Sequence, residues 1–390
     1  MKNVFETLKE LENEIKPLEE YEIISLENAC KRILTEDIYA QKNLPSFDNA
    51  ALDGYAFNYD DINEPLSVKG SILAGDKNAY ELGKNETFRI MTGAIMPKNA
   101  DTILMIEDEF LQNEKLIIKN PPKRYNAYRF KGEEVKFGEL LLKKGLKIKP
   151  SHIALLASQG IYKIKVARKL SVGIFSSGNE LYEPWQNCDE KSIYNANALP
   201  LMTMFENTTY LGIIKDDFES TKKALKSPGY DILISSGGAS VGEADFMQKA
   251  LFELGFKPIF TGLKARPAKP TKLFKRGQNL VLILPGNPMS AFLSAFVFGK
   301  KILNLLSGNL EIPISFEAKM GMDLKLKGGR NNFVLGNLQD EIFMPFNENK
   351  FGSGMILPLV NSNFLFISDE NSTQIKKGDK IKILKLWKFS

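Results

Sequence analysis

Residues 169–310 alternate short apolar runs with amphipathic segments, and this alternation constrains the fold more than any other feature of the chain. The apolar runs include SVGIFSSG, DILISSGG and LVLILPG, and helical patterns such as ALPLMTMFEN and DFMQKALFELG stand between them. Strands that alternate with helices in this way form a parallel sheet with helices on both faces. The pattern therefore predicts an α/β domain over residues 169–310.

The segments on either side of this domain have different patterns of apolar and polar residues. Residues 46–142 contain short β-type runs separated by Gly, Asn and Pro turns, which predicts an inserted β module. That module interrupts residues 1–45 and 143–168, which we expect to form a discontinuous helical linker domain. Residues 311–390 lose the helical patterns, so we expect a C-terminal β domain. A chain of 390 residues is too long for one core, and a multidomain α/β plus β protein fits this length.

Helical spacing of apolar residues in the linker segments predicts three helices, over residues 3–15, 25–33 and 149–160. In the last of these we expect Ser151 to be the N-cap, because its hydroxyl can accept from the first free backbone N–H groups. Gly160 is expected to end the same helix, since glycine adopts the left-handed conformation that follows a helix C-terminus.

The charged and sulfur-containing residues exclude several function classes. The 52 Lys and Arg against 47 Asp and Glu give a net charge of only +5 without a basic arm, which argues against a nucleic acid partner and suits a small anionic ligand. Cys30 and Cys188 do not form a C-x-x-C pair, which argues against a disulfide framework and a thiolate zinc site and favours a cytoplasmic location. The only histidine is His152, so classical triads and His-based zinc sites are disfavoured.

No segment reads as a signal peptide or a membrane span. The amino terminus alternates apolar and charged residues, whereas a signal peptide needs an uninterrupted apolar stretch. The most apolar run, residues 291–298, is followed by Lys300 and Lys301, well short of the roughly 20 residues that cross a bilayer. We therefore expect a buried helix there and no membrane partner.

Three of the apolar strands end in loops of small residues, at 176–180, 235–245 and 285–290. In an open α/β sheet, ligands bind at the carboxyl ends of strands, where backbone N–H groups attract anions. Each loop alone is also an ordinary turn between a strand and a helix. Together they predict one pocket. Its candidate substrate-binding residues are Ser236, Gly237, Gly238, Ser240, Pro285, Gly286, Asn287, Pro288 and Ser290.

Charged residues near these loops predict how an anion is held. Glu180, Glu243 and Asp245 would repel a bare phosphate unless a divalent cation such as Mg²⁺ accompanied it. The alternative is that the last two only stabilise a helix N-terminus. Arg266 and Lys269 follow the run KPIFTG in a segment stiffened by two prolines, and they are candidates to bind the rest of the anion. A basic surface turn is the alternative there.

In chain order, FDNAALDGYA, RIMTGAIMP, RFKGEEV, SSGNEL, SSGGASVGEAD, ARPAKP and PGNPMSA resemble the molybdopterin molybdenumtransferase family, which is related to the E domain of gephyrin. The resemblance spans essentially the whole chain. It implies a homodimer of multidomain subunits with a molybdopterin-binding α/β domain. The implied reaction takes adenylylated molybdopterin, cleaves its pyrophosphate bond with Mg²⁺ or another divalent cation, and transfers molybdate onto the dithiolene while AMP leaves.

The resemblance also implies the roles of individual residues. Seven residues match functional positions of the family. They are the basic pair Arg266 and Lys269 together with Asp53, Thr92, Glu180, Asp216 and Asp245. We expect Thr92 to bind substrate and the four carboxylates to be catalytic, three of them (Glu180, Asp216 and Asp245) as metal ligands.

The chain departs from the family pattern at two places. Glu134 stands where the family has Asp after Gly-Glu, and we still expect it to be catalytic because the charge is kept. The segment Arg266-Pro267-Ala268-Lys269-Pro270 stands where the family commonly has Lys-Pro-Gly-Lys-Pro, which replaces a point charge by a planar guanidinium.

Two other functions remain open at this point. The α/β domain also resembles molybdopterin adenylyltransferase, the enzyme that makes the adenylylated substrate and is a candidate partner, but that enzyme would be a lone α/β domain. A non-catalytic scaffold of the gephyrin type is the other alternative. Retention of nearly every acidic position argues against a scaffold, because clustered carboxylates are costly to maintain without a function.

Overall fold

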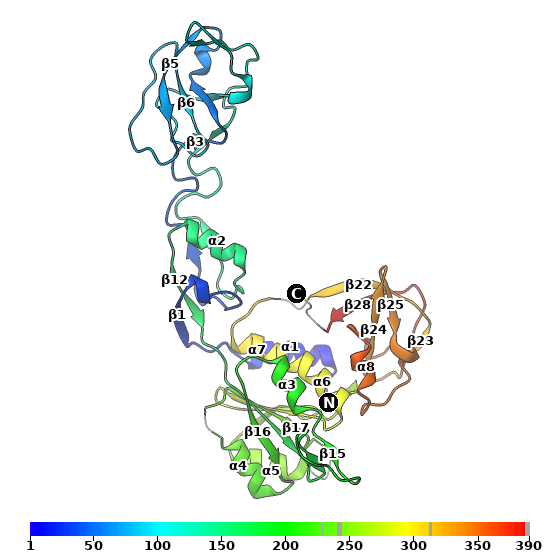
Figure 1. Ribbon diagram of the computed structural model, residues 1–390. Helices are drawn as coiled ribbons and strands as arrows, with labels where there is room; N and C mark the ends of the chain where they lie inside the picture. Colours follow the sequence, from blue (N-terminus) through cyan, green and yellow to red (C-terminus); the bar gives the residue numbers. More distant parts are fainter. Residues whose placement is uncertain (228, 240–243, 312–313, 387–390) are drawn as a thin grey trace. The chain divides into compact units, whose positions relative to one another are not determined.

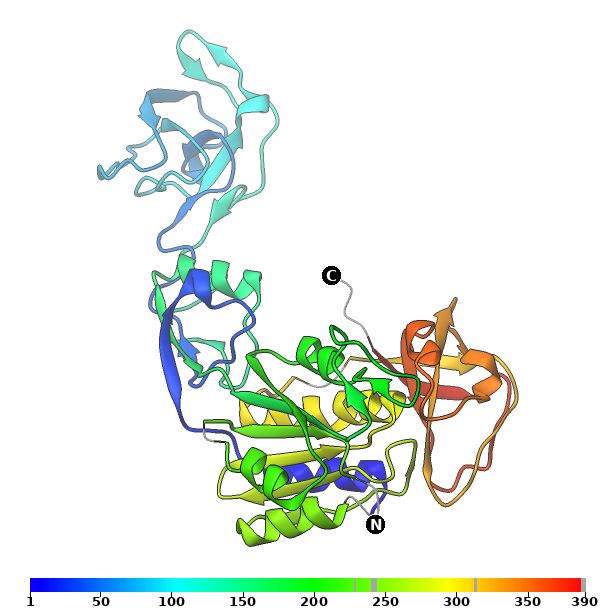
Figure 2. The same cartoon turned by 60° about the horizontal axis from the view of Figure 1, so that its bottom comes forward.

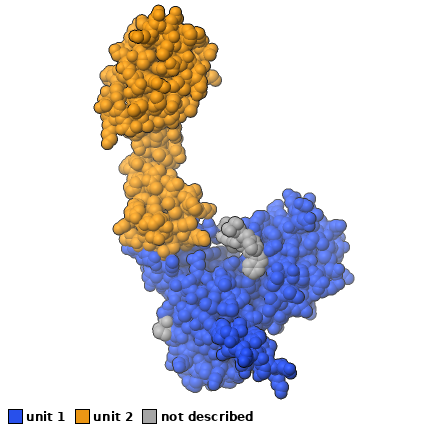
Figure 3. Space-filling model, in the orientation of Figure 1, with its two compact units in different colours: residues 1–22, 145–147, 167–390 blue, residues 23–144, 148–166 orange. Residues whose placement is uncertain are grey.

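The computed structural model describes residues 1–227, 229–239, 244–311 and 314–386, with the backbone alone described at Ala244 and Asp245. The chain forms two compact units (Figure 3). Unit 1 contains residues 1–22, 145–147 and 167–390, and unit 2 contains residues 23–144 and 148–166.

The centre of unit 1 is a six-stranded sheet (Figure 1). Its strands, in spatial order, are β16 (Thr208–Ile214), β13 (Val172–Ser177), β17 (Ile232–Ser236), β21 (Asn279–Leu284), β20 (Lys272–Arg276) and β18 (Lys257–Phe260). The first four are parallel, and β20 runs antiparallel to both of its neighbours. The predicted α/β domain is confirmed, but β20 was not among the predicted strands, and it makes this edge of the sheet mixed.

Helices cover both faces of this sheet (Figures 1 and 2). The strands alternate between the faces: Ile232 and Ile234 belong to one buried cluster, and Leu233 belongs to the other. On the first face lie α1 (Val4–Glu14), α3 (Ala198–Met204), α6 (Pro288–Ser294) and α7 (Lys300–Leu306), and on the second lie α4 (Phe218–Leu225) and α5 (Ala244–Glu253). Burial on both faces explains why these strands read as continuous apolar runs.

A π-helical turn, Ala295–Gly299, joins α6 to α7. By length and composition the combined segment Pro288–Leu306 could cross a membrane, but 67% of its most apolar window is buried inside the protein. Phe292, Leu293 and Phe298 pack into the core of the sheet. The expectation of a buried helix in this region is confirmed.

Helix α1 packs on the sheet of unit 1, although residues 1–45 were expected to belong together to the linker domain. Val4 and Leu11 are fully buried in the same cluster as Ile174 of β13. The physical reason is that an amphipathic helix must bury its apolar face, and the sheet offers a large apolar surface for it.

The C-terminal part of unit 1 is a β domain, as expected. Its main sheet has the order β19-β24-β25-β22-β28-β26, and β24 also pairs with β26. The strands are β19 (Ala265–Arg266), β22 (Ser315–Met320), β24 (Asn331–Gln339), β25 (Ile342–Pro345), β26 (Phe364–Ile367) and β28 (Lys380–Lys385). A separate pair consists of β23 (Leu324–Lys325) and β27 (Gln374–Ile375), and α8 spans Leu357–Val360. Strand β19 is part of the basic segment of the α/β domain, so Arg266 of this segment is held directly by the C-terminal sheet.

Unit 2 contains the predicted all-β module. Its main sheet has the order β7-β4-β6-β5-β9-β8, and β10 pairs with β3. The strands are β3 (Asn49–Ala50), β4 (Gly54–Phe57), β5 (Leu66–Ile72), β6 (Glu86–Ile90), β7 (Thr102–Met105), β8 (Leu111–Gln112), β9 (Lys115–Leu116) and β10 (Tyr128–Arg129). Phe57, Ile72, Ile90 and Ile103 are among its fully buried side chains.

The rest of unit 2 is less helical than expected. Helix α2 spans Pro150–Ser158, but the predicted helix over residues 25–33 is wrong, because only the 3₁₀ turn Leu26–Asn28 forms there. Short strands occupy much of the linker instead: β1 (Tyr21–Ser25) pairs with β12 (Lys163–Ala167), and β2 (Ile38–Tyr39) with β11 (Leu140–Leu142).

The C-terminal end of α2 was predicted correctly, but its N-cap was not. Lys149 rather than Ser151 is its N-cap, because Pro150 already has the dihedral angle of a first helical residue. Gly160 follows the helix with a φ of +75°, which confirms it as the stop.

An ion pair fixes the start of β13 to the start of β17. Arg168 donates to both carboxylate oxygens of Asp231 at 2.7 Å, and Ser171 N–H donates to Asp231 Oδ2 at 2.8 Å. Burial would raise the pKa of the Asp231 carboxyl, but the Arg168 and Ser171 donors lower this pKa below its ordinary value.

A lowered pKa in the folded state means that the Asp231 contribution to stability is present at neutral pH and is lost as the pH falls below about 4. Asp231→Asn is therefore expected to destabilise the protein by about 1–3 kcal/mol at pH 7, because it leaves Arg168 without its bidentate partner. The gap between variant and wild type should narrow towards pH 3 in denaturant unfolding. Asp340→Asn, at an exposed position, is the control and should change little.

Candidate functional site

The loops that follow β13, β17 and β21 lie side by side at one edge of the sheet of unit 1. The strands pair in register, with Ser176 opposite Ser236 and Ser236 opposite Leu284. Gly237 N–H donates to Leu284 O at 3.2 Å, which joins the second loop to the third strand end. A Cβ at Gly237 would lie 2.3 Å from Ser177 O, and its φ is +100°. Only glycine fits here, so the first and second loops are in direct contact.

Two of the expected metal-binding carboxylates lie at the first loop: Glu180 belongs to it, and Asp216 contacts it from another strand end. Asp216 follows β16 and accepts from Ser177 Oγ at 2.6 Å and from Asn179 N–H at 3.1 Å. The Glu180 carboxylate lies over Gly178, where an added Cβ would be 2.8 Å from either of its oxygens. Both carboxylates therefore border the backbone of residues 178 and 179.

The remaining acidic candidates of this site are not described. The side chain of Asp245, and Ser240 and Glu243 entirely, lie outside the described residues. Within the described part of the chain, no three His, Cys, Asp or Glu side chains form a group that could hold a metal ion.

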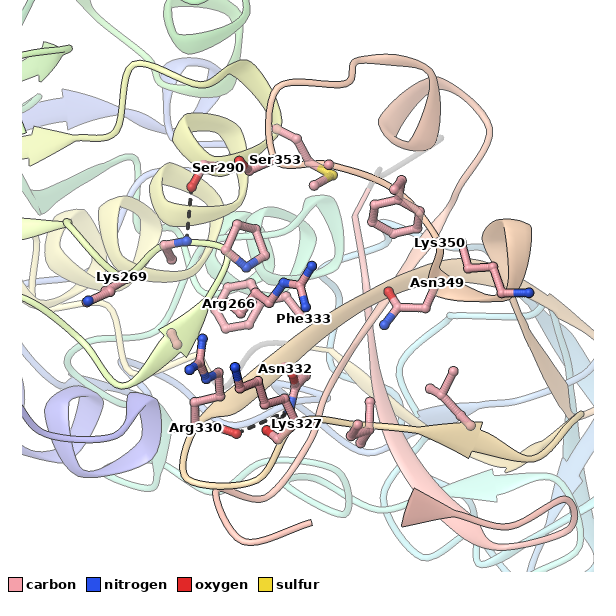
Figure 4. Close-up of a pocket in the computed structure, with 18 of the residues that line it drawn as sticks. Arg266, Lys269, Ser290, Lys327, Arg330, Asn332, Phe333, Asn349, Lys350 and Ser353 are labelled. Atoms are coloured by element: carbon pink, nitrogen blue, oxygen red, sulfur yellow. Dashed lines mark hydrogen bonds between the residues drawn. The ribbon is translucent and has the colours of Figure 1, made fainter. Parts of the chain in front are cut away.

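The basic segment lines a cavity of about 840 Å³ between the strand-end loops and the C-terminal β domain (Figure 4). Arg266 and Lys269 lie on one wall, together with Asn287 and Ser290 of the third loop. Ser290 Oγ accepts from Ala268 N–H at 2.9 Å, which ties the basic segment to the start of α6. Pro285 also lines this cavity.

Ala268 occupies the place where the family commonly has glycine. Its φ is +80°, a conformation that L side chains rarely adopt, and its side chain is buried. The backbone shape expected for glycine is therefore kept in spite of the added methyl group.

The opposite wall of the cavity comes from the C-terminal domain, and none of its residues was a candidate from the sequence. It contributes Lys325, Lys327, Arg330 and Lys350. Asn332 Nδ2 donates to Lys327 O at 3.1 Å and to Arg330 O at 3.2 Å, which holds the turn that carries two of these cations (Figure 4). In the sequence these cations look like ordinary surface residues, and only the run KLKGGR hints at their clustering.

The cavity has an excess of positive charge. Its lining contains six cationic side chains against the carboxylates of Asp323 and Glu348, and Glu348 already pairs with Lys350. Within the described residues, no carboxylate pairs with the other five cations, Arg266, Lys269, Lys325, Lys327 and Arg330. Such a cavity attracts anions, and guanidinium groups suit oxyanions because they can donate two parallel hydrogen bonds.

Unit 2 carries the other candidate residues. Asp53 Oδ1 accepts from both Thr92 N–H and Thr92 Oγ1 at 2.7 Å. The Thr92 hydroxyl and N–H lower the pKa of the Asp53 carboxyl, so it is ionised at neutral pH.

Glu133 and Glu134 differ in what their side chains do. Glu133 accepts from Arg129 Nε at 3.1 Å and from Phe130 N–H at 2.8 Å, so it stabilises its own loop. Glu134 is exposed, and its carboxylate has no hydrogen bond or ion pair with a described residue. Its charge is therefore available to a ligand.

Family models match the chain in three segments. Residues 2–160 match "MoeA N-terminal region (domain I and II)", residues 173–304 match "Probable molybdopterin binding domain", and residues 317–386 match "MoeA C-terminal region (domain IV)".

Whole-chain relatives agree with these matches. The chain is 33% identical to a molybdopterin molybdenumtransferase of Haemophilus influenzae over 93% of both chains. It is 29% identical to one of Nostoc, over 94% of this chain and 88% of that one. Its structure is similar to that of a molybdopterin biosynthesis MoeA protein from Pyrococcus horikoshii, with a TM-score of 0.84 at 27% identity over 99% of this chain and 100% of that one.

Proposed function

This chain belongs to the molybdopterin molybdenumtransferase family, and from this premise we propose how its site performs the transfer of molybdenum to molybdopterin. The substrates of the proposed reaction are molybdate and molybdopterin that carries AMP on its phosphate. Water cleaves the pyrophosphate bond, which gives AMP and molybdopterin with its own phosphate. Molybdenum then binds the two dithiolene sulfurs, and one oxygen of molybdate leaves as water together with the two protons of the thiols. Molybdenum here is cargo, and the protein supplies the binding sites and the charge.

The observation that carries this proposal is the cationic cavity beside the strand-end loops. Molybdate is a dianion, and the uncompensated cations of the cavity favour it. The volume of about 840 Å³ lies in the usual range for small-molecule sites and exceeds what one oxyanion fills. Molybdate and part of the organic substrate can therefore occupy it together. We assign Arg266, Lys269 and Arg330 to oxyanion binding.

The strand-end loops are assigned to the phosphates of the adenylylated substrate. The glycines at 237, 238 and 286 allow close approach of backbone N–H groups, and the side chains of Ser236, Asn287 and Ser290 add hydrogen-bond partners. Pro288 begins α6, so the free N–H groups of the first turn of this helix follow directly.

The carboxylates that border the first loop suit a hard divalent cation such as Mg²⁺, because all of their donor atoms are oxygens. Glu180 and Asp216 would hold it, and Asp245 is the third proposed ligand. When bound, the cation would neutralise part of the negative charge of the pyrophosphate group. Ser177 and Asn179 keep the Asp216 carboxylate in place through their hydrogen bonds.

The proposed site also includes residues of unit 2, supplied by the partner subunit of a homodimer. Asp53, held by Thr92, and the unpaired Glu134 are the carboxylates assigned to this role. The adenylyltransferase that makes the substrate is a proposed partner. A cytoplasmic location is part of the same proposal, and it is supported by two cysteines that are both free thiols.

Release of AMP tests this function. Purified protein is incubated with adenylylated molybdopterin, and AMP is measured with and without Mg²⁺ and molybdate. We expect AMP release only when both are present, because the carboxylates and the cationic cavity hold different ions. AMP formed from ATP and free molybdopterin would instead identify an adenylyltransferase, and absence of AMP under all conditions would support a scaffold.

A further inference from the structure

The segment between β15 (Ile193–Tyr194) and α3 touches the ends of all three strands that carry the candidate loops. Two asparagines make these contacts, Asn195 to β13 and Asn197 to the loops after β17 and β21. Neither residue was a sequence candidate, and no role in the proposed function has been given to them above.

Asn197 bridges the second and third loops with a single amide group. Its Nδ2 donates to Ser236 Oγ at 2.7 Å and to Gly286 O at 2.7 Å. A backbone carbonyl can only accept, so the contact with Gly286 fixes which end of the amide faces the loops. Both partners are residues of the proposed phosphate-binding loops.

Asn195 anchors this bridge to the first strand. It is 2% exposed, its Oδ1 accepts from Ser176 Oγ at 3.1 Å, and its Nδ2 donates to Tyr210 OH at 2.8 Å. The Tyr210 hydroxyl in turn donates to Glu183 Oε1 at 2.7 Å. Burial and this carboxylate raise the pKa of Tyr210, so the hydroxyl stays protonated and the chain of hydrogen bonds keeps one direction.

We propose that Asn197 is a positioning residue, which holds the loops after β17 and β21 at the separation that the pyrophosphate of the substrate requires. The sheet itself does not need this contact, because β17 and β21 are already paired along five residues and buried on both faces. The contact lies at the carboxyl ends of the strands, since Ser236 is the last residue of β17 and Gly286 follows the last residue of β21 by two positions. The effect on catalysis rests on the proposed function, whereas the effect on loop separation does not.

The test compares Asn197→Ala and Asn197→Asp with Asn279→Ala and Asn279→Asp. Asn279 is a matched control, because its Nδ2 also donates to a backbone carbonyl, Tyr230 O at 2.9 Å, but at the opposite end of β21. For AMP release with molybdate and Mg²⁺, we expect kcat/KM to fall about tenfold or more in the Asn197 variants. The Asn279 variants should keep wild-type values, and all four proteins should keep the wild-type circular dichroism.

Amide hydrogen exchange gives a second readout that needs no substrate. Gly237 N–H, which donates to Leu284 O across the same gap, should exchange about tenfold faster in the Asn197 variants and at the wild-type rate in the Asn279 variants. Unchanged exchange, or faster exchange with unchanged kcat/KM, would overturn the positioning role. If wild-type protein releases no AMP, the proposed function fails, and exchange at Gly237 alone still decides whether Asn197 holds the loops together.

Discussion

Mixed dimers of Asp53→Ala and Asp245→Ala subunits are expected to regain activity that neither variant has alone. If each site combines unit 2 of one subunit with unit 1 of the other, a mixed dimer contains one site with both carboxylates intact. A random equimolar mixture should then recover about a quarter of wild-type AMP release, since half of its dimers are mixed and each has one complete site. The measurement is AMP release after subunit exchange, which two different affinity tags verify.

The reciprocal mixture provides the control. The double variant Asp53→Ala, Asp245→Ala is mixed with wild-type subunits. A shared site makes every mixed dimer inactive, so about a quarter of the wild-type activity remains, whereas a site within one subunit leaves about half. No recovery in the first mixture, together with half activity in the second, would contradict the shared site.

Removal of two charges from the cationic cavity should raise the molybdate requirement by about 100-fold. In the variant Arg266→Gln, Lys269→Gln, two charge-assisted hydrogen bonds to the oxyanion are lost, each contributing about 1.5 kcal/mol, or roughly tenfold in affinity. The measurement is the molybdate concentration at half-maximal AMP release. In wild type this concentration should also rise with ionic strength, because salt screens the attraction, and the variant should depend less on salt.

The matched control is Lys319→Gln, Lys382→Gln. These two lysines are exposed on β22 and β28 of the same unit, and neither lines the cavity. The control changes the net charge by the same amount as the cavity variant. Equal molybdate requirements in the two double variants would show that overall charge, and not the cavity, attracts the oxyanion.

The sequence by itself determined those strands, loops and helices that depend only on residues close together in the chain. The runs that became β13, β17 and β21 could be recognised because burial on both faces demands continuous apolar residues, and the glycines after them mark turns. Of these glycines, Gly237 has a φ of +100° and no room for a Cβ beside Ser177 O. The helix after Pro288 and the stop at Gly160 follow from similarly local rules. The resemblance of the motifs to one family then indicated the chemistry.

Some elements depended on partners far away in the chain. Helix α1 packs on the sheet because the sheet offers an apolar face for its own apolar residues. Strand β20 lies between β18 and β21, and residue spacing alone does not identify these two strands as its neighbours. Around Leu26 the sequence has a helical pattern, but the preceding strand β1 pairs with β12, and only a 3₁₀ turn forms at Leu26–Asn28.

Only the tertiary structure decided how the candidate site is completed. Lys325 and Arg330 are indistinguishable in the sequence from lysines and arginines that merely face water, and they line the cavity because β19 pairs with β24 of the C-terminal domain. The role proposed for Asn197 likewise depends on a hydroxyl group and a carbonyl group that lie 39 and 89 residues away in the chain. Periodicity and turn chemistry are properties of neighbouring residues, whereas a binding site is made by side chains that folding brings together.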